Sequence, residues 1–143
     1  MCDLRIASDK SKFAETFSKL SLVPGDGGTF FLQRVIGYTK AMEMFLTGDL
    51  YRAHAAKEMG LVNYLVSHDE LLDKAQELAD KISKNGPVAM SMTKKALKMG
   101  RTQDLNSQLE LLASFQGIAQ RTNDHFEGLD AFNEKRDADF KGE

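Results

Sequence analysis

The sequence has little cysteine, no long hydrophobic run and almost no net charge. A single cysteine among 143 residues excludes a disulfide framework within the chain and a cysteine-ligated zinc site. No apolar run approaches the ~18 residues needed to span a bilayer, and residues 1–5 lack the basic start and apolar core of a signal peptide. The formal net charge of −2 argues against nucleic-acid binding. We therefore expect a soluble, cytoplasmic protein with no membrane or nucleic-acid partner.

Hydrophobic periodicity predicts a mainly helical chain with a few short strands at its N-terminal side. Residues 3–7 and 61–66 have the patterns of strands, and residues 13–17 could form a third. Apolar residues at helical spacing predict helices over residues 30–36, 41–46, 53–59, 71–82, 87–100, 105–119 and 123–132. Two or three short strands make a poor sheet, so the first strand is expected to have neighbours outside this chain.

Polar residues and glycines mark the expected ends of several helices. Ser67 and Glu70 have the spacing of a capping box before the helix over 71–82. Asp104 is expected to cap the helix that follows it, and Asn123 or Asp124 the last helix.

The densest cluster of glycine and proline surrounds Asp26. Gly25, Gly27 and Gly28 allow positive φ angles and a close approach of the backbone to a ligand. A helix that begins just after this loop would direct free N–H groups to the same place. Asp26 is therefore either a helix cap or a carboxylate presented to a substrate. The residues alone favour the cap, because aspartate is among the commonest N-cap residues.

Other candidate groups have ordinary structural interpretations beside the functional ones. The basic cluster over residues 94–101 is either a phosphate-binding patch or a solvated helix face, and the solvated face is favoured. Phe126, Leu129 and Phe132 are either ordinary core or a docking face for a partner or an apolar ligand. The three histidines show no metal-ligand spacing, so no metal site is expected. There is no P-loop, dinucleotide fingerprint or nucleophile elbow.

Five separated motifs occur in the order and spacing of one family. They are Cys2–Ser8, Leu22–Thr29, Ala41–Met44 with Leu46–Gly48, Ala53–Ala56 with Gly60–Val62, and Ala131–Arg136. Together they resemble the C-terminal half of the enoyl-CoA hydratase/isomerase (crotonase) superfamily, and the resemblance covers essentially the whole chain. This superfamily hosts several reactions on one scaffold, so the resemblance is weaker evidence for a particular reaction.

The resemblance implies an α/β fold, mainly helical in this chain. Residues 1–66 would be the C-terminal part of a spiral of ββα units, and residues 67–143 a helical region that mediates trimerisation and contacts CoA. The expected substrates are acyl-CoA thioesters, with no cofactor beyond the CoA of the substrate. The expected assembly is a homotrimer, or a hexamer of two trimers. Family members also have a further N-terminal half, which supplies two backbone N–H groups as an oxyanion hole, so a separate N-terminal half is a further expected partner.

Asp26 gains a catalytic interpretation from the same resemblance. In dienoyl-CoA isomerases and in the 4-chlorobenzoyl-CoA dehalogenase an aspartate at this loop position is the catalytic carboxylate, so Asp26 would be an acid/base or a nucleophile. Gly25, Gly27 and Gly28 would shape the loop and let the acyl chain pass.

The C-terminal motif predicts contacts with CoA. Phe132 and Lys135 match the Phe-x-x-Lys that in hydratases reaches the adenine end of CoA, where a lysine is a suitable point charge against phosphate.

One departure from the family pattern concerns the hydratase glutamate of this half. The position that should hold it is Phe17, which has no acid–base chemistry. Glu15 lies two residues earlier and would share the face of Phe17 in a strand, as a weak substitute.

The expected function is enoyl-CoA hydratase/isomerase-type processing of an acyl-CoA thioester through a stabilised enolate, with hydration ahead of isomerisation. This activity would require the missing N-terminal half. The alternative is a non-catalytic half that binds CoA or mediates assembly.

Overall fold

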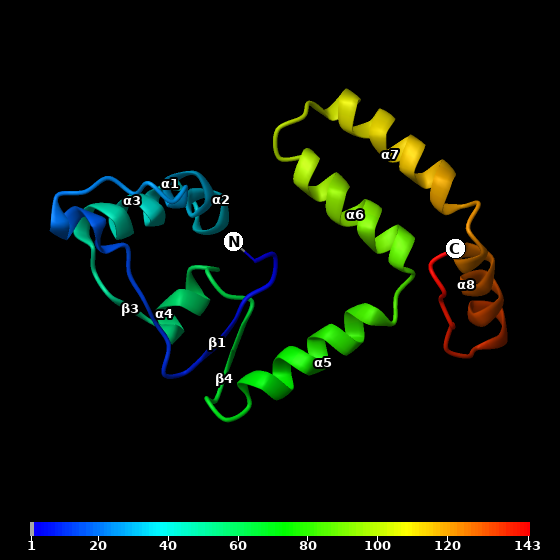
Figure 1. Cartoon of the computed structure of the whole chain (residues 1–143), viewed down its shortest axis with the longest axis horizontal. Helices are drawn as coiled ribbons and strands as arrows, with labels where there is room; N and C mark the ends of the chain where they lie inside the picture. The colour runs from blue at the N-terminus through cyan, green and yellow to red at the C-terminus, as the bar shows by residue number, and fades with distance from the viewer. Residues whose placement is uncertain (1) are drawn as a thin grey trace. The chain divides into compact units, whose positions relative to one another are not determined.

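The computed structural model describes residues 2–143 (Figure 1), which fall into two compact units, Met1–Gln76 and Glu77–Glu143. Helix α5 (Leu71–Ser83) runs across the boundary between them. The functional division predicted between residues 66 and 67 stays a prediction. Within residues 2–143, no helix is both long enough and apolar enough to cross a membrane.

The first unit combines short strands with short helices. Strand β1 pairs in parallel with β4, with Ile6 opposite Tyr64, and strand β2 pairs antiparallel with β3, with Phe13 opposite Tyr51. The elements are β1 (Ile6–Ser8), β2 (Lys12–Phe13), the 3-10 helix η1 (Thr16–Leu20), α1 (Gly28–Phe31), α2 (Gln33–Ile36), α3 (Tyr38–Thr47), β3 (Tyr51–Arg52), α4 (Ala53–Glu58) and β4 (Tyr64–Val66).

The strand predicted over residues 61–66 is confirmed but shorter, as β4, whereas the strand predicted over residues 3–7 is shifted toward the C-terminus, as β1. Each of β1 and β4 has three residues, and further backbone bonds flank the pair: the amide of Asn63 donates to the carbonyl of Arg5 and that of Asp9 to Val66. This parallel pair has only two strands, whereas parallel sheets are normally wider and covered on both faces.

The possible strand over residues 13–17 is wrong beyond Phe13. The partner strand β3 has only two residues, so pairing ends at Phe13, and the chain then turns into η1. The amide of Leu22 closes this turn by donating to the carbonyl of Phe17 at 3.0 Å. Phe17 therefore lies in a 3-10 helix, and the strand face that it was expected to share with Glu15 does not exist.

A small apolar core holds these elements together. Alanines let the segments approach closely, and Ala56 on α4 is fully buried. Leu32 and Ile36 anchor α1 and α2 in the same core, which fixes the helices that follow the glycine loop. The buried cluster consists of Ala7, Leu32, Ile36, Ala41, Met44, Ala56, Leu61 and Val62.

The second unit contains the end of α5 and three long helices, α6 (Pro87–Met99), α7 (Leu105–Ala119) and α8 (Asn123–Glu134). Helix α6 packs on α7, where the Lys95 ammonium lies over the ring of Phe115 at 5.7 Å from its centroid. The side-chain amide of Gln108 donates to the carbonyl of Ala96 at 3.1 Å. The helices predicted over residues 71–82, 87–100, 105–119 and 123–132 are confirmed, with ends shifted by at most two residues.

The predicted caps have different outcomes. Asp104 caps α7, because its carboxylate accepts from the amide of Ser107 at 3.0 Å. The cap of α8 is Thr122 rather than Asn123 or Asp124, and its hydroxyl accepts from the amide of His125 at 3.1 Å.

The predicted capping box at Ser67 and Glu70 is wrong in its geometry. Helix α5 begins only at Leu71, after Glu70. The hydroxyl of Ser67 donates directly to the Glu70 carboxylate at 2.6 Å. The two side chains therefore close the turn before the helix.

Candidate functional site

The glycine loop places Asp26 at the start of α1. Gly27 is the N-cap residue of this helix, and its φ of 83° lies in the left-handed region. The amide of Gly28 donates to the Asp26 carboxylate at 2.8 Å. Asp26 is therefore not the N-cap residue of α1, which is Gly27, but its carboxylate binds an amide of the first turn from one residue further back. The bond uses only one of the two carboxylate oxygens, so it is compatible with proton transfer at Asp26.

The structural reason for glycine differs among the three glycine positions of this loop. A Cβ atom at Gly28 would lie 2.9 Å from the Asp26 carboxylate and 3.3 Å from the ring of Phe45. Gly27 has the positive φ that L side chains rarely adopt, whereas the space around a Cβ atom at Gly25 is open. The backbone therefore favours glycine at 27, and the absence of a side chain at 28 leaves room for the Asp26 carboxylate against the helix start.

A second carboxyl group lies near Asp26. Glu15 is half-buried just before η1. Its pKa is raised above the ordinary value, first by partial burial and then by the negative charge of Asp26. Glu15 therefore keeps its proton to a higher pH than a free glutamate. This neighbourhood arises from the turn of the chain through η1, and not from the strand face expected from the sequence.

An apolar cavity of about 350 Å³ lies beside this loop, at the lower end of the volumes of small-molecule pockets. Pro24 and Thr29, on either side of Asp26 in the sequence, both line the cavity, and so does Phe45, the ring next to Gly28. Asp26 itself is not a lining residue. The wall comes from η1, the glycine loop, α1, α2 and α3: Ser18, Leu22, Val23, Pro24, Thr29, Gln33, Tyr38, Ala41, Met42, Phe45 and Leu46.

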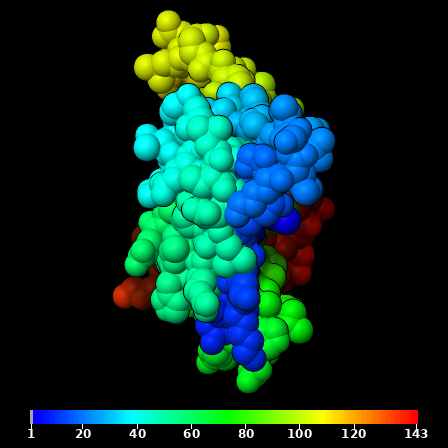
Figure 2. Space-filling view, turned by 90° about the vertical axis from the view of Figure 1, so that its left-hand side faces the viewer, coloured from blue at the N-terminus to red at the C-terminus, as the bar shows by residue number. Residues whose placement is uncertain are grey.

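The surface of this unit is visible in Figure 2, where α3, in cyan, lies beside the N-terminal segments in lighter and darker blue. Large apolar side chains in this region are exposed to solvent. Val23 is 84% exposed and Leu46 is 70% exposed. The cavity thus opens in a surface that is itself unusually apolar.

Phe132 and Lys135, the residues expected to contact CoA, lie in the second unit. Phe132 is on α8 and is 82% exposed, so it is not a core residue of this chain. Lys135 is the residue that ends α8 and is exposed. The structure places these two residues near each other but in a different unit from Asp26 and the glycines.

The remaining candidates give no site. Residues 94, 95 and 98 on α6 and residue 101 beyond the end of this helix are all exposed, which fits solvated side chains. Among residues 2–143, no group of three or more histidine, cysteine, aspartate or glutamate side chains could hold a metal ion.

Sequence reasoning missed the ionic contacts at the end of α8. Glu127 and Arg136 form a bidentate ion pair there. The carboxylate of the buried Asp124 accepts hydrogen bonds from two backbone N–H groups of the last residues. The available signal was the spacing of the two acidic residues, which puts them on one face of the helix.

Known proteins match the chain over its whole length. The family model for enoyl-CoA hydratase/isomerase matches residues 1–143. The 1,2-epoxyphenylacetyl-CoA isomerase of Escherichia coli K12 is 37% identical over 98% of this chain and 53% of its own length. The short-chain-enoyl-CoA hydratase of Clostridioides difficile is 37% identical over 92% of this chain and 84% of its own length.

Solved structures agree with this match. The crystal structure of enoyl-CoA hydratase from Bacillus anthracis superposes with a TM-score of 0.96 at 41% identity, over 99% of this chain and 55% of that one. The chain spans about half the length of most of the curated relatives that it matches, including that isomerase. These lengths do not confirm the prediction that the chain is the C-terminal half. What the matches do establish is the predicted family and its fold: the chain belongs to the enoyl-CoA hydratase/isomerase family, within the crotonase superfamily.

Proposed function

We propose that this chain forms part of the site of an enzyme that processes acyl-CoA thioesters, in a reaction of hydratase or isomerase type. The observation that carries the proposal is the Asp26 carboxylate, fixed by the amide of Gly28 in a loop whose flanking residues line an apolar cavity. An apolar cavity suits the acyl part of such a substrate, and the carboxylate supplies a proton acceptor beside it. The relatives named as a hydratase and an isomerase both act on CoA substrates.

In the proposed mechanism, Asp26 removes a proton from the carbon next to the thioester carbonyl. The electron pair of the C–H bond moves toward the carbonyl and gives an enolate, whose oxygen would be stabilised by backbone N–H groups of the completed enzyme. The carboxyl group exchanges this proton with solvent and delivers a proton to the far end of the conjugated system, which shifts the double bond. In a hydration, water instead adds to the conjugated double bond and gives an enolate. Protonation of this enolate completes the reaction. Both reactions move only protons and water, so they need no cofactor beyond the CoA of the substrate.

Glu15 provides the second proton-carrying group in this proposal. Partial burial and the charge of Asp26 raise its pKa, which favours its protonated form while Asp26 acts as the base. Two carboxyl groups in different environments are a common arrangement for separating acid and base roles. Phe17 lacks the chemistry of the expected glutamate, and Glu15 would take over part of that role.

The CoA end of the substrate would be recognised by the second unit. The exposed ring of Phe132 and the ammonium group of Lys135 offer a stacking surface and a positive charge, which suit an adenine and a phosphate. Gly25, Gly27 and Gly28 would let the acyl chain pass close to the loop backbone.

The test uses a chimera with the Bacillus anthracis hydratase, because this chain superposes on 55% of that chain. The segment that aligns with residues 1–143 is replaced by this chain, and the product is assayed with 2-enoyl-, 3-enoyl- and dienoyl-CoA by mass-resolved chromatography. Asp26→Asn keeps an oxygen that can accept from Gly28 and removes the base. It is expected to lower turnover by roughly 10²–10⁴-fold.

Asp9→Asn is the matched control, because it removes another exposed carboxylate of the same unit, and turnover should stay unchanged. Equal turnover in Asp26→Asn and in the parent would remove Asp26 from the mechanism. A folded chimera that converts none of the substrates would favour the alternative, in which the chain only binds CoA or mediates assembly.

We also propose that the chain assembles into a trimer or a hexamer. Large apolar side chains are exposed in both units, Val23 and Leu46 in the first and Leu105 and Phe132 in the second, and such surfaces commonly mark interfaces. Sedimentation velocity over a dilution series should show species of three or six chains. A monomer at every concentration would overturn this part of the proposal.

A further inference from the structure

The residue that ends α8 has a backbone conformation that needs support. Lys135 has a φ of 57° and a ψ of 41°, in the left-handed region. Its amide donates to the carbonyl of Phe132 at 3.4 Å, and the amide of Arg136 donates to that of Ala131 at 3.1 Å. Glycine usually occupies this position at the end of a helix, and a residue with a side chain is disfavoured there by ~1–2 kcal/mol. Surrounding contacts must therefore hold Lys135 in this conformation.

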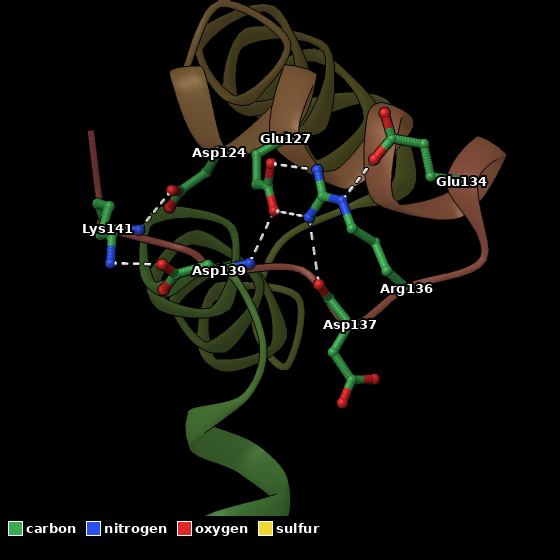
Figure 3. Close-up of polar contacts among 7 residues, drawn as sticks. All are labelled: Asp124, Glu127, Glu134, Arg136, Asp137, Asp139 and Lys141. Carbon is green, nitrogen blue, oxygen red and sulfur yellow. Dashed lines mark hydrogen bonds and ion pairs between the residues drawn. The ribbon is translucent and has the colours of Figure 1, made fainter.

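The next residue supplies such contacts (Figure 3). The guanidinium group of Arg136 donates to both oxygens of the Glu127 carboxylate, at 2.5 and 2.9 Å, and its Nε donates to Glu134 at 2.6 Å. Both carboxylates belong to α8, which ends directly before Lys135. A planar guanidinium held in this way fixes direction as well as distance. We call Glu127, Glu134 and Arg136 the arginine clamp.

Glu127 also fixes the chain beyond the turn. Its carboxylate accepts from the amide of Asp139 at 2.8 Å, and these contacts lower its pKa to about 2. Glu127 is therefore ionised at neutral pH and is able to pair with Arg136.

The last residues are held against the helix at a second point. Asp124 is buried, and its carboxylate accepts from the amides of Lys141 and Gly142 at 2.7 and 2.9 Å. Burial alternates along this segment, with residues 138, 140 and 142 turned inward. Phe140 lies against Gly128, where a Cβ atom would be 3.5 Å from its ring. The chain is therefore fixed both before and after Lys135.

We infer that Arg136 and Glu127 are positioning residues for Lys135: the arginine clamp holds the left-handed turn that directs the Lys135 ammonium toward a phosphate of CoA. The inference rests on the proposed function, in which Lys135 binds CoA. The charge of Arg136 is used by two carboxylates of the chain itself, whereas Lys135 projects from an exposed turn. Arg136 thus holds the backbone of the turn, and the adjacent Lys135 binds the ligand.

The test is a double-mutant cycle on the affinity of the full 143-residue chain for CoA, measured by calorimetry at low ionic strength. Arg136→Lys keeps the positive charge and loses the bidentate contact with Glu127. It should raise the Kd for CoA by roughly threefold to tenfold. Glu127→Gln should act in the same direction. Lys135→Gly removes the ammonium group, and glycine readily adopts the left-handed conformation of this turn. Arg121→Lys is the matched control, on an exposed arginine of the same unit, and should leave the Kd unchanged.

The informative result is the effect of Arg136→Lys in the Lys135→Gly background. If Arg136 acts through Lys135, this second change has almost no further effect on the Kd. Equal effects in both backgrounds would mean that Arg136 only stabilises the unit or binds CoA itself, and would overturn the inference while leaving the proposed function intact. An unchanged Kd for Lys135→Gly, or no CoA binding by the parent chain, would instead contradict the proposed role of Lys135, and the inference with it.

Discussion

The Asp26 carboxylate is compatible with both interpretations that the sequence alone presents as alternatives. Its carboxylate accepts from the amide of Gly28, and this bond holds it in place without using its second oxygen. Its neighbour Glu15 is driven toward the protonated form by burial and by the charge of Asp26. This bond therefore supports the proposed chemistry, because it orients the base before a substrate arrives.

Glu127 gives a prediction about pH at the same scale. Its pKa in the folded chain is about 2, below the ordinary value of 4.5. The ionised carboxylate of Glu127 therefore stabilises the folded state in full only at a pH above this ordinary pKa. That contribution is lost as the pH falls from about 4.5 toward 2, because the unfolded chain takes up the proton first.

We therefore expect the urea midpoint of the parent chain to fall more steeply over this acid range than that of Glu127→Gln. Unfolding curves at a series of pH values measure the difference. Parallel profiles for the two chains would show that the Glu127–Arg136 pair contributes nothing to stability.

At the scale of elements, amphipathic periodicity predicted the long helices well and the short elements less well. Helices α5 to α8 have enough turns for an apolar face to be visible in the sequence. Residues 13–17 are too polar for a clear strand pattern, and the two-residue partner β3 ends the pairing at Phe13. The approach of Glu15 to Asp26 depends on the turn through η1, and no local pattern encodes it.

The cap of α8 gives a prediction at this scale. The hydroxyl of Thr122 accepts from the amide of His125 and donates to the carbonyl of Ala119. Thr122→Ala should lower the free energy of unfolding by about 1 kcal/mol, measured by chemical denaturation. Thr122→Ser retains the hydroxyl and is expected to be close to the parent. Equal losses in both variants would assign the effect to the methyl group and not to the cap.

At the scale of the whole chain, the candidate residues fall in two separate units. The first holds Asp26, Glu15 and the apolar cavity, and the second holds Phe132 and Lys135. The family could be predicted from the sequence because its motifs recur in order along the chain. The partial coverage could be predicted for the same reason, since the motifs resemble those of one half of a family member, and the chain spans about half the length of most of its curated relatives.

The proposed role of Asp26 as the proton carrier is tested most directly by the incorporation of solvent deuterium into the substrate. The chimera with the Bacillus anthracis hydratase is incubated with a 3-enoyl-CoA in D₂O, and deuterium at C2 and C4 is followed by mass spectrometry. The parent chimera should incorporate deuterium at these carbons, and Asp26→Asn should lower the rate by roughly 10²–10⁴-fold while still binding the substrate. Incorporation at the same rate in Asp26→Asn and in the parent would contradict the account, because the proton would then be moved by another group.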